Sequence, residues 1–240
     1  MAEMRKLPHA LRSKNLFSRR EFVDAMSSSY GMTEPQIAYD LQKRLDCGML
    51  IRVGWGQYAQ PEKPVYSYEY SEQAVDVAER IENEYDGLDF RVFELVQLND
   101  FINHQIAHNT IFVTIENDLV DFAFDSLWKA YPGRVMLKPR AEQYYRYHQD
   151  NDIIVGRLPS ESPKGFDQPW ESRLEKILVD VFTDKLMSTI VPDGEKQAII
   201  DGAFNEYMLD EKTMLRYARR KGAEKKMQQV LKKYRGVAAQ

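Results

Sequence analysis

The stretch that decides the fold runs from Ser18 to Ala59: SRREFVDAMSSSYGMTEPQIAYDLQKRLDCGMLIRVGWGQYA. Its first helix start is Ser18-Arg-Arg-Glu21, a capping box in which the serine oxygen accepts from the third helical N–H and the glutamate reaches back. Phe17, just before the box, and Phe22 have the spacing of a hydrophobic staple. These residues predict a helix that begins directly after Ser18.

A second helix start follows at Thr33-Glu-Pro-Gln36, with Met32 and Ile37 as its staple. The break before it contains Gly31, which can adopt the left-handed conformation that ends a helix. The second helix places apolar side chains on one face at a spacing of four and ends near Cys47-Gly48; those side chains are Ile37, Leu41 and Leu45. Two capped helices separated by a glycine turn are typical of a helix-turn-helix.

The segments Met49–Val53 and Gln57–Ala59 have strand-like patterns, joined across Gly54-Trp-Gly56 as a tight hairpin. The order helix, turn, helix, hairpin predicts a winged helix-turn-helix over residues 1–60. In the second helix, Gln36, Tyr39 and Lys43 turn outward together when the apolar face is buried, and Asp40 and Arg44 flank them. Gln can bond adenine, Lys can reach guanine or phosphate, and Tyr can bond or stack.

Further cations and an aromatic residue extend this candidate surface. Arg19 and Arg20 stand at the start of the first helix, where a helix N-terminus and two guanidinium groups favour phosphate. Arg52 and Trp55 on the hairpin can contact the sugar-phosphate backbone or the minor groove. The predicted DNA-binding set is Arg19, Arg20, Gln36, Tyr39, Lys43, Arg44, Arg52 and Trp55. A winged helix that mediates protein contacts is the alternative.

The net charge of −4 hides an uneven distribution. Residues 1–60 carry nine Lys or Arg and six Asp or Glu, residues 61–211 carry 14 and 30, and residues 212–240 carry ten and one. The three segments therefore have formal charges of +3, −16 and +9. The middle segment would repel a DNA duplex, so DNA contacts are expected at the two ends of the chain. Removal of residues 212–240 is therefore expected to weaken DNA binding at low salt. A solvated helix face and an acidic protein partner are the other interpretations of the basic end.

Gln60-Pro-Glu-Lys-Pro64 marks a domain boundary, after which residues 64–240 alternate between strand and helix patterns. Strands are predicted at 65–68, 90–95, 110–115, 133–137 and 152–155. Helices are predicted at 72–85, from an Asn117 cap to about 130, and at 171–183, 193–207, 210–220 and 223–234. The fold class is therefore mixed α/β (α+β), a winged helix-turn-helix followed by an α/β domain whose helical carboxyl-terminal part, about residues 171–236, ends in basic helices.

The sequence contains only incomplete catalytic and metal-binding motifs. His104-Gln-Ile-Ala-His108 has helical ligand spacing but lacks the glutamate base of a zinc peptidase and a third ligand. Phosphate-binding glycine loops and a nucleophile elbow are absent, and Cys47 is expected to be a buried apolar residue. A metal-dependent nuclease could be built from Asp152, Glu171 and Lys176, whereas Glu175 and Asp180 fit helix capping and salt bridges better. We therefore expect a non-enzymatic protein without cofactor or bound metal.

Hydrophobic residues make up 43% of the chain, enough for a core, yet no run approaches the ~18 apolar residues of a membrane span. The start, MAEMRKLPHALRSKN, lacks the apolar stretch of a signal peptide. A cytoplasmic protein without membrane contact is expected.

Several segments together resemble a known family: SRREFVDAM and TEPQIAYDLQKRLDCGMLIRVGWGQYA, then IFVTIENDL, SRLEKILVDVF and LRYARRKG. Over most of its length the chain resembles the AbiE-type antitoxins, and more closely bacterial transcriptional-regulator-like proteins paired with nucleotidyltransferase toxins. The resemblance implies a winged-helix operator binder joined to a larger antitoxin domain, with Thr33–Leu45 as the DNA-reading helix and Leu50–Tyr58 as the wing. Asp40 and Asp46 depart from the basic recognition helix common in that family.

The resemblance implies a type IV toxin–antitoxin system for abortive infection against phage. In such systems the antitoxin represses its own operon and opposes a nucleotidyltransferase-like toxin without a stable direct complex. The leading hypothesis is therefore a DNA-binding autorepressor and antitoxin that acts as a homodimer on its operator, since one small reader covers only a half-site. Two alternatives stay open: an interaction module whose acidic middle domain docks a basic partner, and a metal-dependent nuclease.

Overall fold

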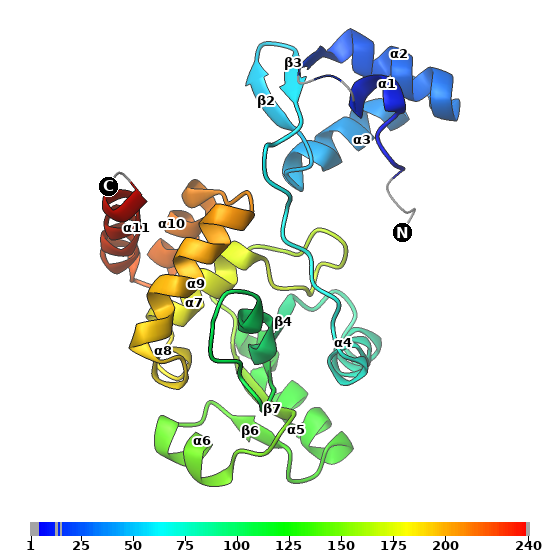
Figure 1. Cartoon of the computed structure of the whole chain (residues 1–240). Helices are drawn as coiled ribbons and strands as arrows, with labels where there is room; N and C mark the ends of the chain where they lie inside the picture. Colours follow the sequence, from blue (N-terminus) through cyan, green and yellow to red (C-terminus); the bar gives the residue numbers. More distant parts are fainter. Residues whose placement is uncertain (1–4, 13, 15, 239–240) are drawn as a thin grey trace. The chain divides into compact units, whose positions relative to one another are not determined.

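The computed structural model describes residues 5–12, 14 and 16–238. The chain divides into two compact units (Figure 1). The first contains the described residues up to Tyr66 together with Glu206–Met208, and the second contains Ser67–Asn205 and the residues from Leu209 onward. The main segment of the first unit thus ends close to the boundary predicted at Gln60–Pro64, but the inclusion of Glu206–Met208 was not predicted.

Three helices of the first unit are α1 (His9–Arg12), α2 (Arg19–Tyr30) and α3 (Glu34–Asp46). The capping box at the start of α2 is confirmed, because the Glu21 amide donates to Ser18 Oγ over 3.2 Å and the Ser18 amide donates to the Glu21 carboxylate over 2.7 Å. The staple is confirmed as well, since the rings of Phe17 and Phe22 are stacked with their centroids 6.1 Å apart. Gly31 ends α2 at φ 63°, in the left-handed region where glycine is favoured.

The strands of the first unit are β1 (Phe17–Ser18), β2 (Ile51–Gly54) and β3 (Gln57–Ala59), arranged antiparallel in the order β1-β3-β2. The predicted hairpin is confirmed, with Gly54 paired to Gln57 across the two-residue turn Trp55-Gly56. A small core lies between the helices and the sheet, formed by Leu11, Phe17, Phe22, Met26, Ile37, Leu41, Leu50 and Tyr58. Fully burying each large apolar side chain contributes about 1.5–3 kcal/mol to folding, so this core stabilises the unit.

The second unit is built on a mixed four-stranded sheet, which confirms the α/β class. Its strands are β4 (Phe90–Glu94), β5 (Thr110–Ile115), β6 (Val135–Leu137) and β7 (Asp152–Arg157). The order is β4-β5-β7-β6, with β4 antiparallel to β5 and the other neighbours parallel. All residues of β4 are buried, as expected for a strand covered on both faces.

Two helices cover one face of this sheet, α4 (Glu72–Glu84) and α5 (Val120–Ala130). Their apolar stripes pack in one core cluster with Val92, Val113 and Val155, which are aligned across three neighbouring strands. Shorter helical segments connect the strands: the 3₁₀ turns η1 (Leu95–Asp100) and η2 (Asn117–Leu119), and the helix α6 (Ala141–Tyr147).

The remainder of the chain is helical, as predicted. Its elements are α7 (Leu174–Thr183), α8 (Met187–Ile190), α9 (Asp193–Glu206), α10 (Glu211–Arg220) and α11 (Glu224–Ala238). Helix α7 is buried along most of its length, and α10 and α11 both pack against it. Among the described residues, no helix is long and apolar enough to cross a membrane.

Three local predictions are wrong. Residues 65–68 form no strand; their aromatic rings pack singly, as in the edge-to-face contact of Tyr68 with Tyr70. The helix predicted from Glu171 begins at Leu174, because Glu171 and Ser172 are held in β-bridges. Helix α5 begins at Val120, directly after the 3₁₀ turn η2, whereas the prediction started it next to Asn117. For the start of α7, Val92 is a partner distant in the sequence that determines the local conformation.

Candidate nucleic-acid interface

Helix α3 presents a row of polar side chains to solvent. Gln36 and Tyr39 are exposed, the latter at 73%, and Lys43 is half-buried. The opposite face of the helix, with Ile37 and Leu41, is buried in the core. Because residues three and four positions apart lie on the same face of a helix, these three side chains form one continuous strip that a ligand can approach.

Gln36 has a second role that limits how it can read a base. Its side-chain oxygen accepts a hydrogen bond from the Thr33 amide over 2.9 Å, as the second capping box predicts. Bidentate recognition of adenine needs both the oxygen and the NH₂ group of the glutamine. While the cap is formed, the NH₂ group is therefore the part of Gln36 suited to bond a base acceptor.

Arg44 is not part of the exposed surface, and its prediction as a DNA contact is wrong. Arg44 is 3% exposed, and its Nε lies 2.5 Å from Oδ2 of the buried Asp40. Its Nη2 also donates to the carbonyl of Arg5 over 2.5 Å. The pair neutralises Asp40, the acidic residue that departed from a basic recognition helix, and ties the segment before α1 to α3.

The hairpin presents its turn to solvent. Trp55 occupies the first position of the two-residue turn and is 97% exposed. Arg52 is exposed on β2 while its guanidinium lies 5.7 Å from the ring centroid of Tyr58, a cation–π contact that keeps the charge on the sheet surface. Both residues are therefore accessible, as the predicted contact with DNA requires.

The start of α2 adjoins this turn, since the Arg19 amide donates to the Gly56 carbonyl over 2.9 Å. The side chains of Arg19 and Arg20 are exposed. The helix N-terminus itself is not free for phosphate, because the Arg19 and Glu21 amides are already bonded. A hydrogen bond from Lys14 and the capping bonds of Ser18 lower the pKa of Glu21 to about 2, so a carboxylate occupies that end. The exposed guanidinium groups of Arg19 and Arg20 are the cationic groups that this end offers to an anion.

Sequence reasoning missed an apolar component of this surface. Every residue of β2 is exposed, including Ile51 and Val53, and Met49 just before it is exposed as well. Strand β2 is the outer strand of the sheet, with a neighbour on one side. The alternation Ile51-Arg-Val53 indicates a strand in the sequence, but it does not reveal which strand lies at an edge.

In the second unit the proposed nuclease residues do not come together. Glu171 bridges to Val92 in β4, whereas Asp152 lies in β7, two strands beyond. At about 4.8 Å per strand spacing the two are separated by roughly 14 Å, far more than a shared metal ion allows. Asp152 is instead paired with Arg134, whose Nε lies 3.1 Å from Oδ1.

Lys176, the third residue of that set, belongs to a buried ionic cluster. Its Nζ donates to Oδ2 of Asp180 over 2.8 Å, and the Tyr217 hydroxyl donates to Oδ1 over 3.1 Å. Lys221 also donates to Asp180. Burial lowers the pKa of Lys176. The pKa of Asp180 is also lowered, because the attraction of Lys176 and Lys221 outweighs the effect of burial, which alone would raise it. The cluster joins α7 to α10, and the salt-bridge roles predicted for Asp180 and for Glu175, which pairs with Arg173, are confirmed.

The segment from His104 to His108 is irregular, so the inference of helical ligand spacing is wrong. His104 Nδ1 lies 2.8 Å from a carboxylate oxygen of Glu195, while the His108 ring meets that of His148 edge-on. Within the described part of the chain, no group of three or more His, Cys, Asp or Glu side chains could hold a metal ion. Cys47 is buried, and burial raises the pKa of its thiol, in line with the expected apolar role.

A family model matches residues 36–236 of this chain. The chain belongs to the family of unknown function DUF6577. The match includes Gln36, Tyr39 and Lys43 as well as the hairpin, and it begins after α2. No curated protein sequence matches the chain.

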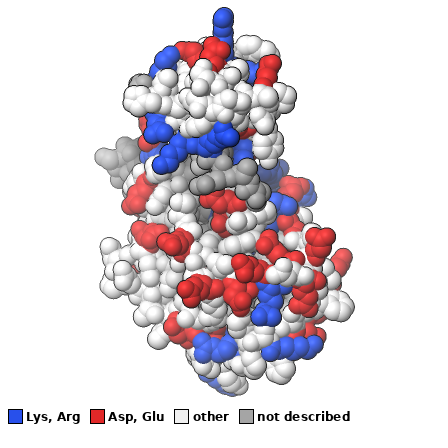
Figure 2. Space-filling model, turned by 90° about the vertical axis from the view of Figure 1, so that its right-hand side faces the viewer, with Lys and Arg blue, Asp and Glu red and all other residues white. Residues whose placement is uncertain are grey.

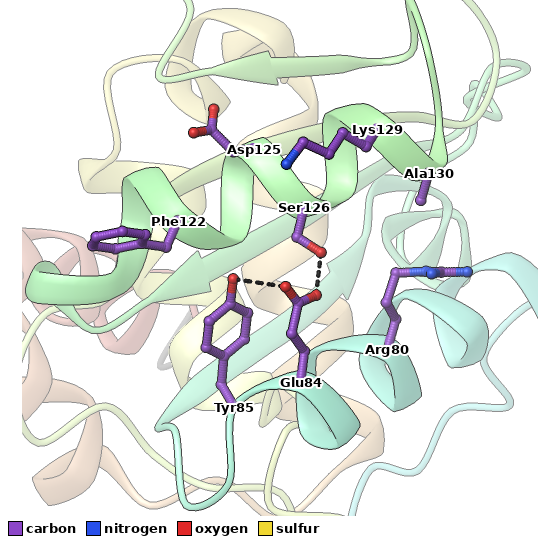
Figure 3. Close-up of a pocket in the computed structure, with 8 residues that line it drawn as sticks. All are labelled: Arg80, Glu84, Tyr85, Phe122, Asp125, Ser126, Lys129 and Ala130. Atoms are coloured by element: carbon purple, nitrogen blue, oxygen red, sulfur yellow. Dashed lines mark hydrogen bonds between the residues drawn. The ribbon is translucent and has the colours of Figure 1, made fainter.

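The part of the chain covered by the DUF6577 model also contains a groove between α4 and α5, with a volume of about 480 Å³. Glu84 points into it and accepts hydrogen bonds from the hydroxyls of Ser126 and Tyr85 (Figure 3). Arg80 and Lys129 lie at one side and the exposed ring of Phe122 at the other. The carboxylate of Glu84 is therefore held in place by two donors, one from each wall of the groove.

Acidic side chains surround this groove. Figure 2 shows the face of the second unit on the side of α4, and Asp and Glu are spread over it. The exposed acids of the two helices are Glu72, Asp76, Glu79, Glu82, Glu84, Asp121 and Asp125. This face of the second unit therefore repels polyanions such as DNA.

Proposed function

We propose that the first unit is a winged helix-turn-helix that reads double-stranded DNA with α3 and the β2–β3 hairpin. The observation that carries the proposal is the exposed strip of Gln36, Tyr39 and Lys43 on a helix whose opposite face is fixed in the core. A rigid helix that presents a donor, an aromatic hydroxyl and a cation matches the base edges and phosphates of a major groove.

Of the three acidic residues of α3, Asp40 and Asp46 have partners on the same helix, and Glu34 is exposed in the first turn. Asp40 is neutralised by Arg44, and Asp46, at the last position of the helix, accepts a hydrogen bond from Gln42 over 2.8 Å. The hairpin contributes Arg52 and Trp55, which suit the backbone or the minor groove beside the helix. The DNA-binding set therefore becomes Arg19, Arg20, Gln36, Tyr39, Lys43, Arg52 and Trp55.

The resemblance to AbiE-type antitoxins extends the proposal to a biological role. In that role the protein represses its own operon, binds its operator as a homodimer, and counteracts a nucleotidyltransferase-like toxin without a stable complex. Restored growth on co-expression with an adjacent toxin gene would support this role, and the absence of such a gene beside this one would contradict it.

A band-shift titration on the DNA upstream of the gene, repeated across a salt series, tests operator binding. The triple substitution Gln36→Ala, Tyr39→Ala and Lys43→Ala is expected to abolish the preference for that DNA over a random duplex. A matched control replaces Gln143, Tyr147 and Lys129 by alanine; these are exposed residues of the same types in the second unit, and Gln143 caps a helix as Gln36 does. Equal binding by the two triple variants would contradict the proposal.

A second candidate function is favoured by the groove of Figure 3, where Phe122 is 62% exposed among carboxylates. Large exposed aromatic side chains often mark contact surfaces, so the α4–α5 face could dock a basic protein partner. Co-purification with a neighbouring gene product that survives nuclease treatment and is lost with Phe122→Ala would support it. Persistence of the complex with Phe122→Ala would contradict a role for this groove.

A further inference from the structure

Helices α10 and α11 contact each other and form a pair at the end of the chain (Figure 1). Ion pairs join them at both ends: Arg219 Nη2 lies 2.6 Å from a carboxylate oxygen of Glu224, and Arg235 pairs with Glu211. Met214 and Tyr217 of α10 and Met227 and Leu231 of α11 are buried. The pair is therefore packed into the second unit through one face.

The opposite face of α11 is basic. Lys225, Lys226, Lys232 and Lys233 are all exposed. With 3.6 residues per turn, they fall within an arc of roughly 120° around the helix axis. On α10, Lys212 and Arg216 are exposed one turn apart. Six cations thus lie on the solvent side of the pair.

The positive charges of this face are not neutralised by ion pairs with the residues that the structure describes. The two acids of the helices, Glu211 and Glu224, are occupied by Arg235 and Arg219. None of the six cations forms an ion pair with any other residue that the structure describes. Lys226 does help to lower the pKa of Asp193, but that carboxylate has its own partner, Lys196, at 2.6 Å. The face therefore keeps its positive charge, although the rest of the second unit is acidic.

We propose that this basic face, formed by Lys212, Arg216, Lys225, Lys226, Lys232 and Lys233, binds the phosphate backbone of nucleic acid without regard to sequence. The lysines of α11 form two pairs seven residues apart, about 10 Å along the helix, comparable to the roughly 12 Å width of a major groove. A helix laid across that groove would place one pair on each phosphate strand.

The composition of the basic face favours nucleic acid over a protein partner. Protein–protein interfaces have an apolar or aromatic centre and few lysines. Among the described residues of α10 and α11, no large hydrophobic side chain is exposed. Phosphate contacts need only cations, and lysine is a common phosphate-binding residue. The basic face would add affinity to any reader in the first unit but does not depend on one.

The test uses the full chain with Lys225, Lys226, Lys232 and Lys233 all replaced by glutamine. Deleting the helices is unsuitable, because Met214, Tyr217, Met227 and Leu231 would be lost from the core. Glutamine has a helix propensity close to that of lysine, so the fold is expected to persist, and a thermal melt checks it. The control variant removes the same charge from exposed positions elsewhere in the second unit: Lys129, Lys138, Arg140 and Arg146, each replaced by glutamine.

Fluorescence anisotropy with a short random-sequence duplex is measured over a series of salt concentrations. For wild type, log Kd rises linearly with log salt; the four-lysine variant is expected to lower that slope by roughly three to four units and to bind more weakly at low salt. The control variant is expected to keep the wild-type slope. The proposal would be overturned if wild type and the four-lysine variant had equal slopes, or if the four-lysine and control variants lost equal affinity for DNA. It would also be overturned if the four-lysine variant lost affinity for polyglutamate but not for DNA.

The failure of operator reading is distinguishable from the failure of this proposal. If the chain shows no preference for its upstream DNA, yet the four-lysine variant loses random-duplex binding, the role of the basic face is supported and operator reading by the first unit is contradicted. If the preference is present and the four-lysine variant binds random duplex as wild type does, operator reading is supported and the role of the basic face is contradicted.

Discussion

Lys43 and Arg44 are neighbours on α3 with opposite environments. Lys43 is half-buried on the strip with Gln36 and Tyr39, whereas Arg44 is fully buried against Asp40. Their charges are the same, so composition alone cannot separate them. Lys43 is accessible to a ligand, and Arg44 connects α3 to the segment before α1.

Replacing Lys43 by alanine is expected to change DNA binding without changing stability. Loss of one phosphate contact lowers the slope of log Kd against log salt by about one unit. Exposed substitutions of this kind alter the free energy of unfolding by no more than about 0.5 kcal/mol. Anisotropy over a salt series and urea unfolding measure the two quantities; an unchanged slope would remove Lys43 from the interface.

Replacing Arg44 by alanine is expected to have the reverse effect. The carboxylate of Asp40 would stay buried without its partner, which costs about 3–5 kcal/mol of unfolding free energy. The double variant with Asp40→Ala removes the stranded charge and should recover part of that loss. Urea unfolding of the two variants tests this, and a single variant as stable as the double one would contradict the buried ion pair.

At the scale of elements, the capping box of α2 offers a local test. Ser18→Ala removes the oxygen that accepts from the Glu21 amide and should cost about 1 kcal/mol. Ser28→Ala, at an exposed position within the same helix, serves as the control and should be neutral or slightly stabilising, because alanine is the better helix former. Thermal melts of both proteins decide the matter; equal melting temperatures would indicate that the cap contributes nothing.

Features that depend on neighbours in the sequence were predictable, and features that depend on distant partners were not. Both helix starts and the Trp55-Gly56 turn are encoded by residues within four positions of one another. The burial of Arg44 depends on Asp40 and on the carbonyl of Arg5, 39 residues away. Likewise, the delay of α7 to Leu174 follows from the bridge between Glu171 and Val92, which no local pattern reveals.

For the whole molecule, two separate cores imply two unfolding steps. The first unit is stabilised by the cluster around Phe22 and Ile37, and the second by the cluster around Val113 and Val155. Calorimetry of the full chain is expected to show two transitions. Arg44→Ala should lower the midpoint of one and leave the other in place, whereas a single transition that shifts as a whole would show that the units unfold together.

The buried cluster of α7 and α10 predicts a pH dependence for the second unit. Asp180 has a folded pKa below its ordinary value of 3.8, so its stabilising effect is complete above that pH and is lost as the pH falls through the lowered pKa. Asp180→Asn should cost about 3–5 kcal/mol near neutral pH, because Lys176 loses its buried partner. The gap between wild type and variant should therefore stay constant above pH 3.8 and narrow as the pH falls below that value.

Urea unfolding at several pH values measures this gap. Asp86→Asn, at an exposed position of the same unit, provides the control and should track wild type throughout. A constant gap between wild type and Asp180→Asn over the acid range would contradict the assigned ionisation of Asp180.

The exposure of Trp55 gives the molecule an optical reporter of its own. Of the three tryptophans in the chain, Trp170 is 6% exposed, Trp128 52% and Trp55 97%. An indole surrounded by water emits at long wavelength and collides freely with a quencher such as acrylamide. In a Trp128→Phe background, the quenchable emission would come almost entirely from the hairpin turn. Shielding of that emission by an added oligonucleotide would report contact at the turn without any attached dye, in the same titration that measures affinity.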